Sequence, residues 1–333
     1  MLLVDPWGGC SRAVRGLLVV ALGGNAFVRK GEGLDSQWRN VRAAAEAVAR
    51  LVERGYRLVV THGNGPQVGA VLECAHSCPG PRGAGRAITM DVAVAMTQGW
   101  LGYMLQQAIG DALEEKGLER RVATVVTQVL VGRDDPAFRR PSKPVGPFYT
   151  REEAERAARE TGWAFAKDPR GGYRRVVPSP RPRGVVEMGA IEALLRAGYV
   201  VVAGGGGGVP VVRGERWLHG VEAVVDKDYT SSLIARLLGA EALIILTDVP
   251  YVYLDYGRPG QRPLERLTVS EARRLLEEGK LPPGSMGPKV EAAVEYVEER
   301  ARSGCVECYA AIGRLEDAEQ VVEGKKGTRV VLG

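Results

Sequence analysis

Residues 17–26 read LLVVALGGNA, an apolar run that ends in a glycine-flanked asparagine. Residues 58–67, LVVTHGNGPQ, repeat this arrangement, and the two turns contain two of the three asparagines in the chain. Each run predicts a buried strand, and a helical pattern follows each turn. Open α/β sheets bind ligands at the carboxyl ends of their strands, where glycine-freed N–H groups beside a helix favour anions. Two ordinary strand-to-helix turns are the alternative, because Gly and Asn both tolerate positive φ.

Strands and helices alternate along the rest of the chain. The patterns predict helices at 37–54, 66–75, 90–116, 151–161, 185–196, 229–238, 270–278 and 288–301. They predict further strands at 122–126, 199–203, 243–247, 306–311 and 329–332. Such alternation predicts an α/β fold with a mainly parallel sheet covered by helices on both faces.

The composition is that of a globular protein. The chain has 333 residues, enough for one large domain or two lobes with a sizeable core. It is 45% hydrophobic and 26% charged, and no apolar run approaches the roughly 20 residues that span a bilayer. Residues 1–16 lack the features of a signal peptide and read as a tail before the first strand. We therefore expect a cytoplasmic protein without a membrane partner.

Basic charge is concentrated in residues 131–184. This segment has thirteen Lys or Arg against seven Asp or Glu, a net of +6, whereas the whole chain carries +5. A basic, proline-rich insertion is compatible with nucleic-acid binding, but its glutamates interleave with its arginines and it contains no recognisable binding motif. We prefer a small subdomain whose basic groups serve an acidic ligand or form surface ion pairs, and we expect no nucleic-acid partner.

The five cysteines do not predict a disulfide framework in a cytosolic enzyme of this length. Cys305 and Cys308 have the spacing of metal ligands, and Cys74, His76 and Cys78 are further candidate ligands for zinc. We prefer a strand over residues 305–312 to a zinc site, because no strand–C-x-x-C–helix context is present.

Four glycine-rich turns replace the usual nucleotide-binding motifs. The chain has neither G-x-x-x-x-G-K-[ST] nor G-x-G-x-x-G. A third turn, Gly204–Gly208, has no side chain and serves either close approach to a ligand or sharp chain reversal. A fourth turn opens a helix and places Lys289 in its first turn, where a cation is unfavourable for the helix dipole. A polyphosphate at the same helix end would explain that lysine.

Two more lysines are notable because most cations in this chain are arginines. Lys227 stands between Asp226 and Asp228, just before a helix, and Lys143 stands in SKPVGPFYT (142–150). Surface salt bridges are the common reading of such a pattern. The functional reading is a set of positioned ammonium groups, with carboxylates that orient them or help to hold Mg²⁺. Loose phosphoryl transfer requires alignment and positive charge on the moving oxygens.

Seven collinear motifs together resemble the carbamate kinase family of the amino acid kinase superfamily. They are ALGGNA (21–26), THGNGPQVG (61–69), SKPVGPFYT (142–150), AGGGGGVPV (203–211), EAVVDKD (222–228), LTDVPYVYLDYG (246–257) and SMGPKVEAA (285–293). The resemblance implies a three-layer αβα open sandwich with a small protruding subdomain. It also implies a homodimer that interconverts ATP plus carbamate with ADP plus carbamoyl phosphate, using Mg²⁺. By this resemblance, 1–16 is a tail, 17–220 an acceptor lobe with 131–184 protruding, and 221–333 a nucleotide lobe.

The resemblance also assigns site residues. Lys227 would neutralise the transferring phosphate, Lys289 the terminal phosphates of the nucleotide, and Lys143 would hold the carbamate or carbamoyl phosphate. Asp226 and Asp228 would orient the lysines, and the protein ligands of the metal stay unassigned. Substrate and phosphate would contact Gly23, Gly24, Asn25, Gly63, Asn64, Gly65, Gly205 and Gly206. The nucleotide would contact Thr247, Asp248, Val249, Tyr253, Tyr256, Met286 and Gly287, although Tyr253 and Tyr256 read equally well as packing residues.

Three other functions remain open. One is another kinase of the superfamily, acting on acetylglutamate, glutamate, aspartate or a nucleoside monophosphate; residues 142–150 argue against it, because they resemble carbamate kinases specifically. Another is the same enzyme making carbamoyl phosphate for biosynthesis, since one active site catalyses both directions. The last is a nucleotide-sensing or nucleic-acid-binding protein on a kinase scaffold, which the three intact lysines oppose.

Overall fold

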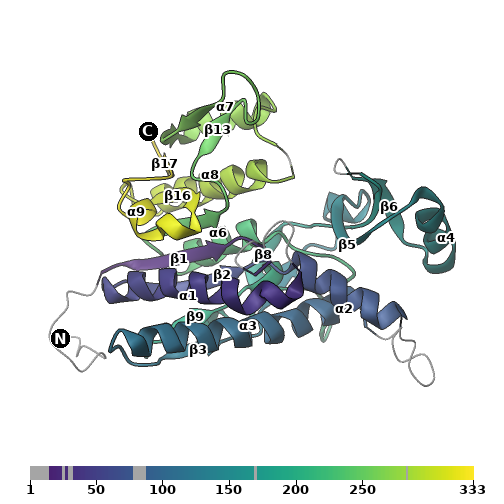
Figure 1. Ribbon diagram of the computed structural model, residues 1–333, viewed down its shortest axis with the longest axis horizontal. Coiled ribbons are helices and arrows are strands. Elements are labelled where there is room, and N and C mark those ends of the chain that lie inside the picture. Colours follow the sequence, from purple (N-terminus) through teal and green to yellow (C-terminus); the bar gives the residue numbers. More distant parts are fainter. Residues whose placement is uncertain (1–14, 25–26, 29–32, 78–87, 169–170, 283) are drawn as a thin grey trace.

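The protein is built around an eight-stranded sheet. The computed structural model describes residues 15–24, 27–28, 33–77, 88–168, 171–282 and 284–333 (Figure 1). The strand order is β15-β17-β16-β12-β1-β2-β9-β3, and every neighbouring pair is parallel except β16 with β17. The strands are β1 (Leu17–Leu22), β2 (Arg57–His62), β3 (Val122–Thr124), β9 (Val200–Val202), β12 (Ala242–Thr247), β15 (Arg266–Thr268), β16 (Tyr309–Arg314) and β17 (Thr328–Val331).

Helices cover both faces of this sheet, because each central strand is apolar on both sides. On β1, Val19 and Ala21 pack into one buried cluster, while Leu18 and Val20 pack into another on the opposite face. The first face carries α5 (Met188–Arg196), α6 (Lys227–Leu237), α7 (Val269–Glu277) and α8 (Met286–Arg302). The second carries α1 (Gln37–Glu53), α3 (Met90–Glu115) and α9 (Ala318–Val322). The expected three-layer αβα sandwich with a mainly parallel sheet is confirmed.

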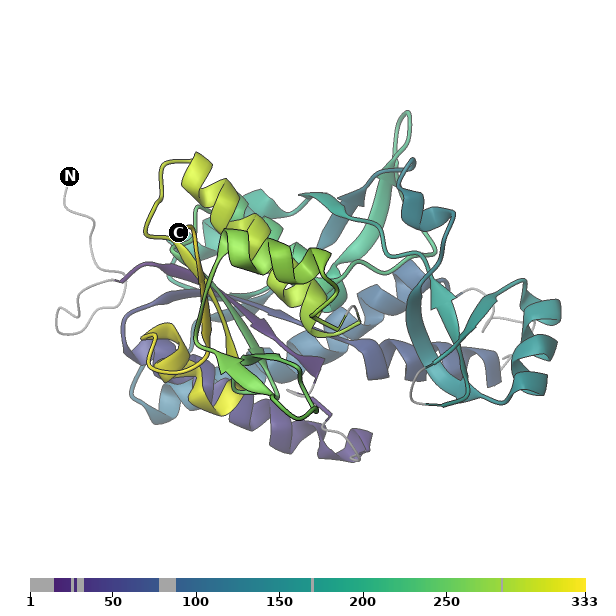
Figure 2. The same cartoon turned by 90° about the horizontal axis from the view of Figure 1, so that it is seen from above.

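A smaller sheet with one helix stands away from this body (Figures 1 and 2). It has the order β5-β7-β6 and lies beside α4 (Arg151–Thr161). Its strands are β5 (Lys143–Tyr149), β6 (Ala164–Lys167) and β7 (Tyr173–Val177), and α2 (Gly65–Ser77) packs beneath β5. We call β5, β6, β7 and α4 the protruding unit.

The remaining strands form two small sheets. One has the order β11-β10-β4-β8, from β4 (Gln128–Val131), β8 (Pro182–Val185), β10 (Val209–Arg213) and β11 (Leu218–Gly220). The other pairs β13 (Val252–Leu254) with β14 (Arg262–Leu264). Short 3-10 turns are η2 (Leu34–Ser36), η4 (Pro136–Phe138), η5 (Gly205–Gly207) and η6 (Leu315–Asp317).

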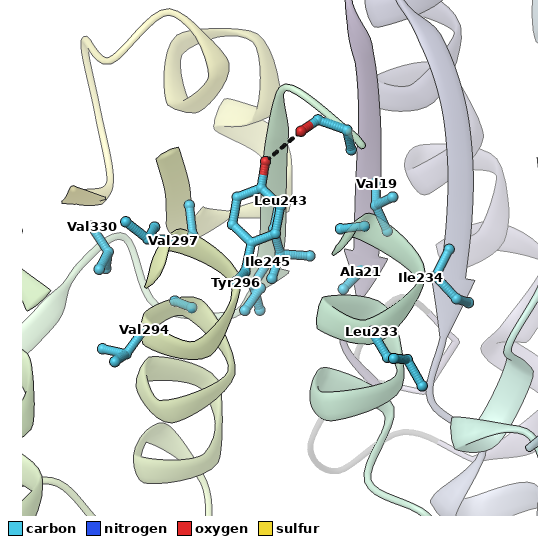
Figure 3. Close-up of a cluster of buried hydrophobic side chains, with 14 of the residues drawn as sticks. Val19, Ala21, Leu233, Ile234, Leu243, Ile245, Val294, Tyr296, Val297 and Val330 are labelled. Carbon is cyan, nitrogen blue, oxygen red and sulfur yellow. Dashed lines mark hydrogen bonds between the residues drawn. The ribbon is translucent and has the colours of Figure 1, made fainter. Parts of the chain in front are cut away.

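Local sequence explains where several helices begin. Thr150 before α4 and Thr268 before α7 each accept a hydrogen bond from the backbone N–H of a glutamate three residues on, and that glutamate returns the contact. These reciprocal caps satisfy N–H groups that have no partner within the helix. Helix α8 is held instead by packing: Tyr296 is fully buried, and its hydroxyl donates to the carbonyl of Ala240 at 2.7 Å (Figure 3).

The expectation of a strand that includes both Cys305 and Cys308 was wrong. Cys305 and Cys308 are joined by a disulfide, and they lie in the turn between α8 and β16. The strand therefore begins at Tyr309 rather than near Cys305, because the short covalent loop closes a turn that extended backbone would not permit. Both sulfurs are consumed by this bond, so the pair does not offer thiolates to zinc in this form. Cys74 is free and exposed, and Cys78 lies outside the described residues.

Another boundary also differs from expectation. Val185 ends β8 rather than beginning the helix, which starts at Met188. Val185 pairs with Val129 in β4, and this tertiary pairing outweighs the helical pattern of the sequence. Across the described ranges, no helix is both long and apolar enough to cross a membrane.

Candidate active site

Turns after β1 and β2 and the starts of α2, α6 and α8 surround one cavity. Its volume is about 490 Å³, and it lies at the carboxyl ends of the parallel strands. Such an edge is where ligands bind in open α/β sheets. Among the described residues, the cavity is lined by Gly24, Gly63, Asn64, Gly65, Pro66, Val68, Lys143, Pro144, Val145, Gly206, Val224, Val225, Asp226, Lys227, Asp228, Gly284, Ser285, Pro288 and Lys289.

The three candidate lysines meet in this cavity through two carboxylates. Lys227 donates to Oδ1 of Asp228 at 2.6 Å, and Lys289 donates to Oδ2 of the same carboxylate at 2.8 Å. Lys143 donates to Oδ2 of Asp226 at 2.5 Å. Oδ1 of Asp226 in turn accepts the backbone N–H of Asp228 at 3.0 Å, capping α6. One continuous network therefore joins residues that are far apart in the sequence.

Burial strengthens the electrostatic interactions in this network and shifts the pKa values of its groups. Burial alone would raise the pKa of Asp228, but Lys227 and Lys289 outweigh that effect and hold the pKa well below its usual range. Burial lowers the pKa of Lys227, with Asp228 acting against this. For Lys289 burial also lowers the pKa, but Asp228, Asp226 and Asp248 together raise it above its ordinary value. Side-chain exposure is 4% for Asp228, 11% for Lys227 and 14% for Lys289, so water screens these charges little.

The protruding unit is docked through the same part of the chain. Lys143 begins β5, and a second contact comes from Arg175 in β7, which donates to Glu222 at 2.9 Å. The other oxygen of Glu222 accepts the N–H of Met90 at the start of α3. Burial lowers the pKa of Arg175, and Glu222 opposes that shift. These two side-chain contacts therefore end on residues 222–226, the segment that leads into Lys227.

The two asparagine turns contribute differently from one another. The N–H of Gly23 donates to the carbonyl of Leu246, and the N–H of Gly63 donates to Leu22, so both groups extend the sheet pairing. Gly24 and Gly63 line the cavity with Gly65, whereas Asn25 lies outside the described residues.

Asn64 also lines the cavity and is itself fixed from behind. Its side chain is buried and donates to the Thr97 hydroxyl in α3 at 2.8 Å. Thr97 in turn donates to the carbonyl of Val94 at 2.8 Å. Helix α3 therefore sets the orientation of the Asn64 side chain.

The five-glycine turn lies behind the site. Its residues are glycines because side chains would not fit there. A Cβ on Gly206 would lie 2.2 Å from Nδ2 of Asn64, and one on Gly207 would lie 2.0 Å from the carbonyl oxygen of Val225. Gly206 and Gly207 also have φ of +65° and +89°, which favour glycine. Gly206 lines the cavity, whereas Gly205 lies against the His62 ring. Close backbone approach is thus the structural reason for this run.

Sequence reasoning missed His62, which ends β2 beneath the cavity. The residue is 1% exposed, and its ring meets Phe27 edge-on at 5.3 Å between centroids. Burial lowers the pKa of His62 to about 4, so the ring is neutral at pH 7. Its Nδ1 lies 3.1 Å from the carbonyl oxygen of Gly63. The sequence signal that could have identified His62 was its position between Thr61 and Gly63 in the second motif.

The candidate nucleotide residues fall into two groups. Thr247 ends β12, and its hydroxyl donates to Asp248 at 3.0 Å; Val249 follows directly. Tyr253 lies in β13, and its ring contacts that of the exposed Tyr256 at 5.7 Å.

The other candidate nucleotide residues open α8. Met286 packs against the buried core, and the N–H of Gly287 donates to the carbonyl of Pro282. Neither residue lines the lysine cavity among the described residues, although Pro288 and Lys289 do. Gly287 and Pro288 border a second cavity, which Tyr229 and Glu291 also line.

The donor set does not form a metal cage by itself. Within the part of the chain that the structure describes, no group of three or more His, Cys, Asp or Glu is placed to hold a metal ion. Both oxygens of Asp228 already accept from lysines. A metal ion in this cavity would therefore need water or substrate oxygens as further ligands.

Comparison with known proteins agrees with this geometry. The family described as the amino acid kinase family matches residues 16–307. Carbamate kinase from Pyrococcus furiosus is 46% identical over 317 residues, covering 94% of this chain and 98% of the relative, and that from Lentilactobacillus hilgardii is 44% identical over 312 residues, covering 93% and 96%. The solved structure of carbamate kinase from Giardia lamblia bound to AMP-PNP has a TM-score of 0.86 and 38% identity, covering 96% of this chain and 99% of that one. The chain therefore belongs to the amino acid kinase family and, within it, to the carbamate kinases.

Proposed function

We propose that the protein transfers a phosphoryl group reversibly between ATP plus carbamate and ADP plus carbamoyl phosphate. The observation that carries this proposal is the network of Lys143, Lys227 and Lys289 on Asp226 and Asp228 in a single cavity. Three relatives that are 40–46% identical over nearly the whole chain are named carbamate kinases. The substrates of this chain follow from that relationship together with the three lysines.

Each lysine has a distinct part in the proposed transfer. Lys143 comes from the protruding unit and holds the acceptor or the carbamoyl phosphate. Lys227 neutralises the moving phosphoryl group, and Lys289, in the first turn of α8, neutralises the terminal phosphates of the nucleotide. A compact ammonium placed on developing negative charge in a water-poor site lowers the barrier strongly. Asp226 and Asp228 keep the ammonium groups in place before substrates bind.

Metal and nucleotide complete the proposal. A Mg²⁺ ion that binds with the nucleotide would supply positive charge to its phosphates. In this chain Asp228 and Asp226 are the carboxylates in the lysine cavity that would face it. The adenine and ribose would lie over the end of β12, against Thr247, Asp248 and Val249, with Tyr253, Tyr256, Met286 and Gly287 at its border. Gly23, Gly24, Asn25, Gly63, Asn64, Gly65, Gly205 and Gly206 would surround the phosphates.

This division of labour suggests two lobes and a tail. Residues 17–220 would form the acceptor lobe, with the protruding segment 131–184, and residues 221–333 would form the nucleotide lobe. Residues 1–16 would be a tail that precedes the acceptor lobe. We place the enzyme in the cytoplasm, where ATP and ADP are available.

A homodimer is also part of the proposal. Its support is an apolar face on α3, where Val92, Met96 and Tyr103 are 41%, 48% and 60% exposed and recur at helical spacing. A second copy of the chain would cover this face. Light scattering should give twice the chain mass, and Met96→Glu should lower it to the monomer; a monomeric wild-type protein would contradict the dimer.

The decisive experiment is an assay of ATP formation from ADP and carbamoyl phosphate with Mg²⁺. We expect turnover with these substrates and none when acetylglutamate and ATP are supplied instead. Turnover with acetylglutamate alone would favour another superfamily kinase. The remaining outcome is a protein that forms no ATP but retains single-stranded nucleic acid in a filter-binding assay at moderate salt. That result would favour a binding protein on a kinase scaffold.

A further inference from the structure

Residues 177–181, which leave the protruding unit, touch the elements that carry all three lysines. We call this segment the crosspiece. Val177 at its start pairs with Lys143 in the antiparallel ladder of β7 with β5, and its carbonyl accepts the N–H of Ser142 at 3.2 Å. The next residue, Pro178, accepts the N–H of Val224 at 3.0 Å, two residues before Asp226. The crosspiece is therefore tied to Lys143 and to the approach to Lys227 through its backbone.

Arg181 ties the same segment to the helix that carries Lys289. Its guanidinium donates to Glu295 at 2.9 Å and to Glu291 through a second nitrogen, and both glutamates lie on α8. The guanidinium also stacks on Tyr229, with its carbon 3.5 Å from the ring centroid. The Tyr229 hydroxyl donates to the other oxygen of Glu291 at 2.6 Å. The Glu291 carboxylate thus bridges α6, α8 and the crosspiece.

The backbone of Arg181 is anchored as well as its side chain. Its N–H donates to Oδ2 of Asp135 at 2.9 Å, and Oδ1 of the same carboxylate accepts the N–H of Ala137. The guanidinium consequently extends from a fixed point. Without it, Glu291 and Glu295 would be like charges four residues apart on one helix face, which is an unfavourable spacing.

We infer that Arg181 is a positioning residue that holds Lys289 in register with Lys143 and Lys227 for phosphoryl transfer. This inference rests on the proposed function. Arg181 touches none of the three lysines; it acts through Glu291, which follows Lys289 by two residues, and through Tyr229, which follows Lys227 by two. Arg181 fixes the distance between the acceptor side and the nucleotide side of the cavity.

A purely stabilising role predicts a different result from a positioning role. The Arg181 side chain is 42% exposed, and ion pairs with that degree of exposure contribute little to stability. A displacement of reacting groups by about 1 Å, however, costs up to roughly a hundredfold in rate. Loss of Arg181 should therefore affect turnover far more than unfolding.

The test uses the full chain and compares Arg181→Ala, Arg181→Lys and Arg273→Ala in ATP formation and in thermal unfolding. Arg273 is the matched control, because it pairs with Glu298 on the same helix α8 through two hydrogen bonds of 2.7 and 2.6 Å. For Arg181→Ala we expect kcat to fall about ten- to a hundredfold with KM for carbamoyl phosphate unchanged and with little change in melting temperature. Arg181→Lys, which keeps the charge but not the planar fork, should give an intermediate kcat.

Each other outcome has a defined meaning. An unchanged kcat in Arg181→Ala, or an equal loss in Arg273→Ala, would overturn the positioning role. If Arg181→Ala does not fold, Tyr229→Phe and Glu291→Gln decide instead: a lowered kcat in both supports the inference, and wild-type rates reject it. An inactive wild-type protein would instead refute the proposed function, which separates the two failures.

Discussion

Lys289 reaches from the first turn of α8 to the Asp228 carboxylate at the start of α6, with 2.8 Å between Nζ and Oδ2. A cation at a helix N-terminus opposes the helix dipole, and burial adds a further cost. Asp228 offsets part of this cost. The position is therefore unfavourable for α8 alone and suits a polyphosphate at the helix end.

Removing either ammonium that shares Asp228 should abolish turnover. Lys227→Ala and Lys289→Ala each remove positive charge from the transferring oxygens, a loss of about a hundred- to a thousandfold or more in kcat. Circular dichroism should show an intact fold. Lys326→Ala is the control, because Lys326 forms a surface pair with Asp317 at 2.6 Å. Near-normal rates in either site variant would refute the assigned roles.

Lys143→Ala should weaken the acceptor side selectively. Lys143 comes from the protruding unit and contacts Asp226 rather than Asp228, so Lys227 and Lys289 keep the carboxylate that they share. We expect KM for carbamoyl phosphate to rise while the Kd for ADP, measured by calorimetry, stays constant. Lys167→Ala, an exposed lysine of the same unit, should match the wild type. Equal weakening of both ligands would move Lys143 out of the acceptor site.

His62 should make the free energy of unfolding depend on pH between about 6.5 and 4. Its pKa in the folded protein is about 4, against 6.5 without burial, so the unfolded chain binds the proton first as pH falls. Stability from this residue is complete above pH 6.5 and declines by about 3 kcal/mol as pH falls to 4. Urea titrations at several pH values should show this decline in the free energy of unfolding for the wild type and not for His62→Gln. Parallel curves would show that His62 does not titrate in this way.

Gly206→Ala should disturb both stability and turnover. The new Cβ would meet Nδ2 of Asn64 at 2.2 Å and would adopt a φ of +65°, which strains the backbone by about 1–3 kcal/mol. Displaced Asn64 would lose its bond to Thr97. Gly189→Ala in α5 is the control, because nothing lies within 4 Å of the added Cβ. Unchanged unfolding and kcat in Gly206→Ala would show that the turn has more room than its packing indicates.

Reduction of the disulfide should lower stability and leave the rate of ATP formation unchanged. The bond between Cys305 and Cys308 closes a very short loop, for which chain entropy gives about 2 kcal/mol. Neither cysteine lines the lysine cavity. A Cys305→Ser and Cys308→Ser double variant should unfold like the reduced protein, whereas Cys74→Ser should keep the response to reductant. A loss of turnover on reduction would connect this turn to the site.

The sequence predicts the central fold well, because its signals there are local. The apolar runs of β1, β2 and β12 are long, and threonine caps with glutamate three residues on mark the starts of α4 and α7. The strands of the protruding unit were missed because two prolines and a glycine interrupt the pattern of β5, and β7 has two arginines directly after its first residue. Such strands form by pairing with one another, and no periodic apolar pattern reveals them.

The candidate site was predicted in part for a similar reason. The motif residues Lys143, Lys227 and Lys289 could be named from their neighbours in the sequence, and the structure brings them to one cavity. Which carboxylate holds which lysine depends on the packing of α6 against α8, and sequence spacing does not contain it. The neutral state of His62 and the contacts of Arg181 likewise arise only from burial and tertiary approach.

The sum of charges in the lysine network has a consequence for ligand exchange. Three ammonium groups and two carboxylates leave a formal excess of only one positive charge. At distances beyond about 10 Å, salt screens so small a net charge, and an approaching anion experiences almost no electrostatic attraction. Attraction becomes strong only when phosphate oxygens enter hydrogen-bonding range of the individual amines. The product can therefore dissociate without working against a strong long-range electrostatic attraction.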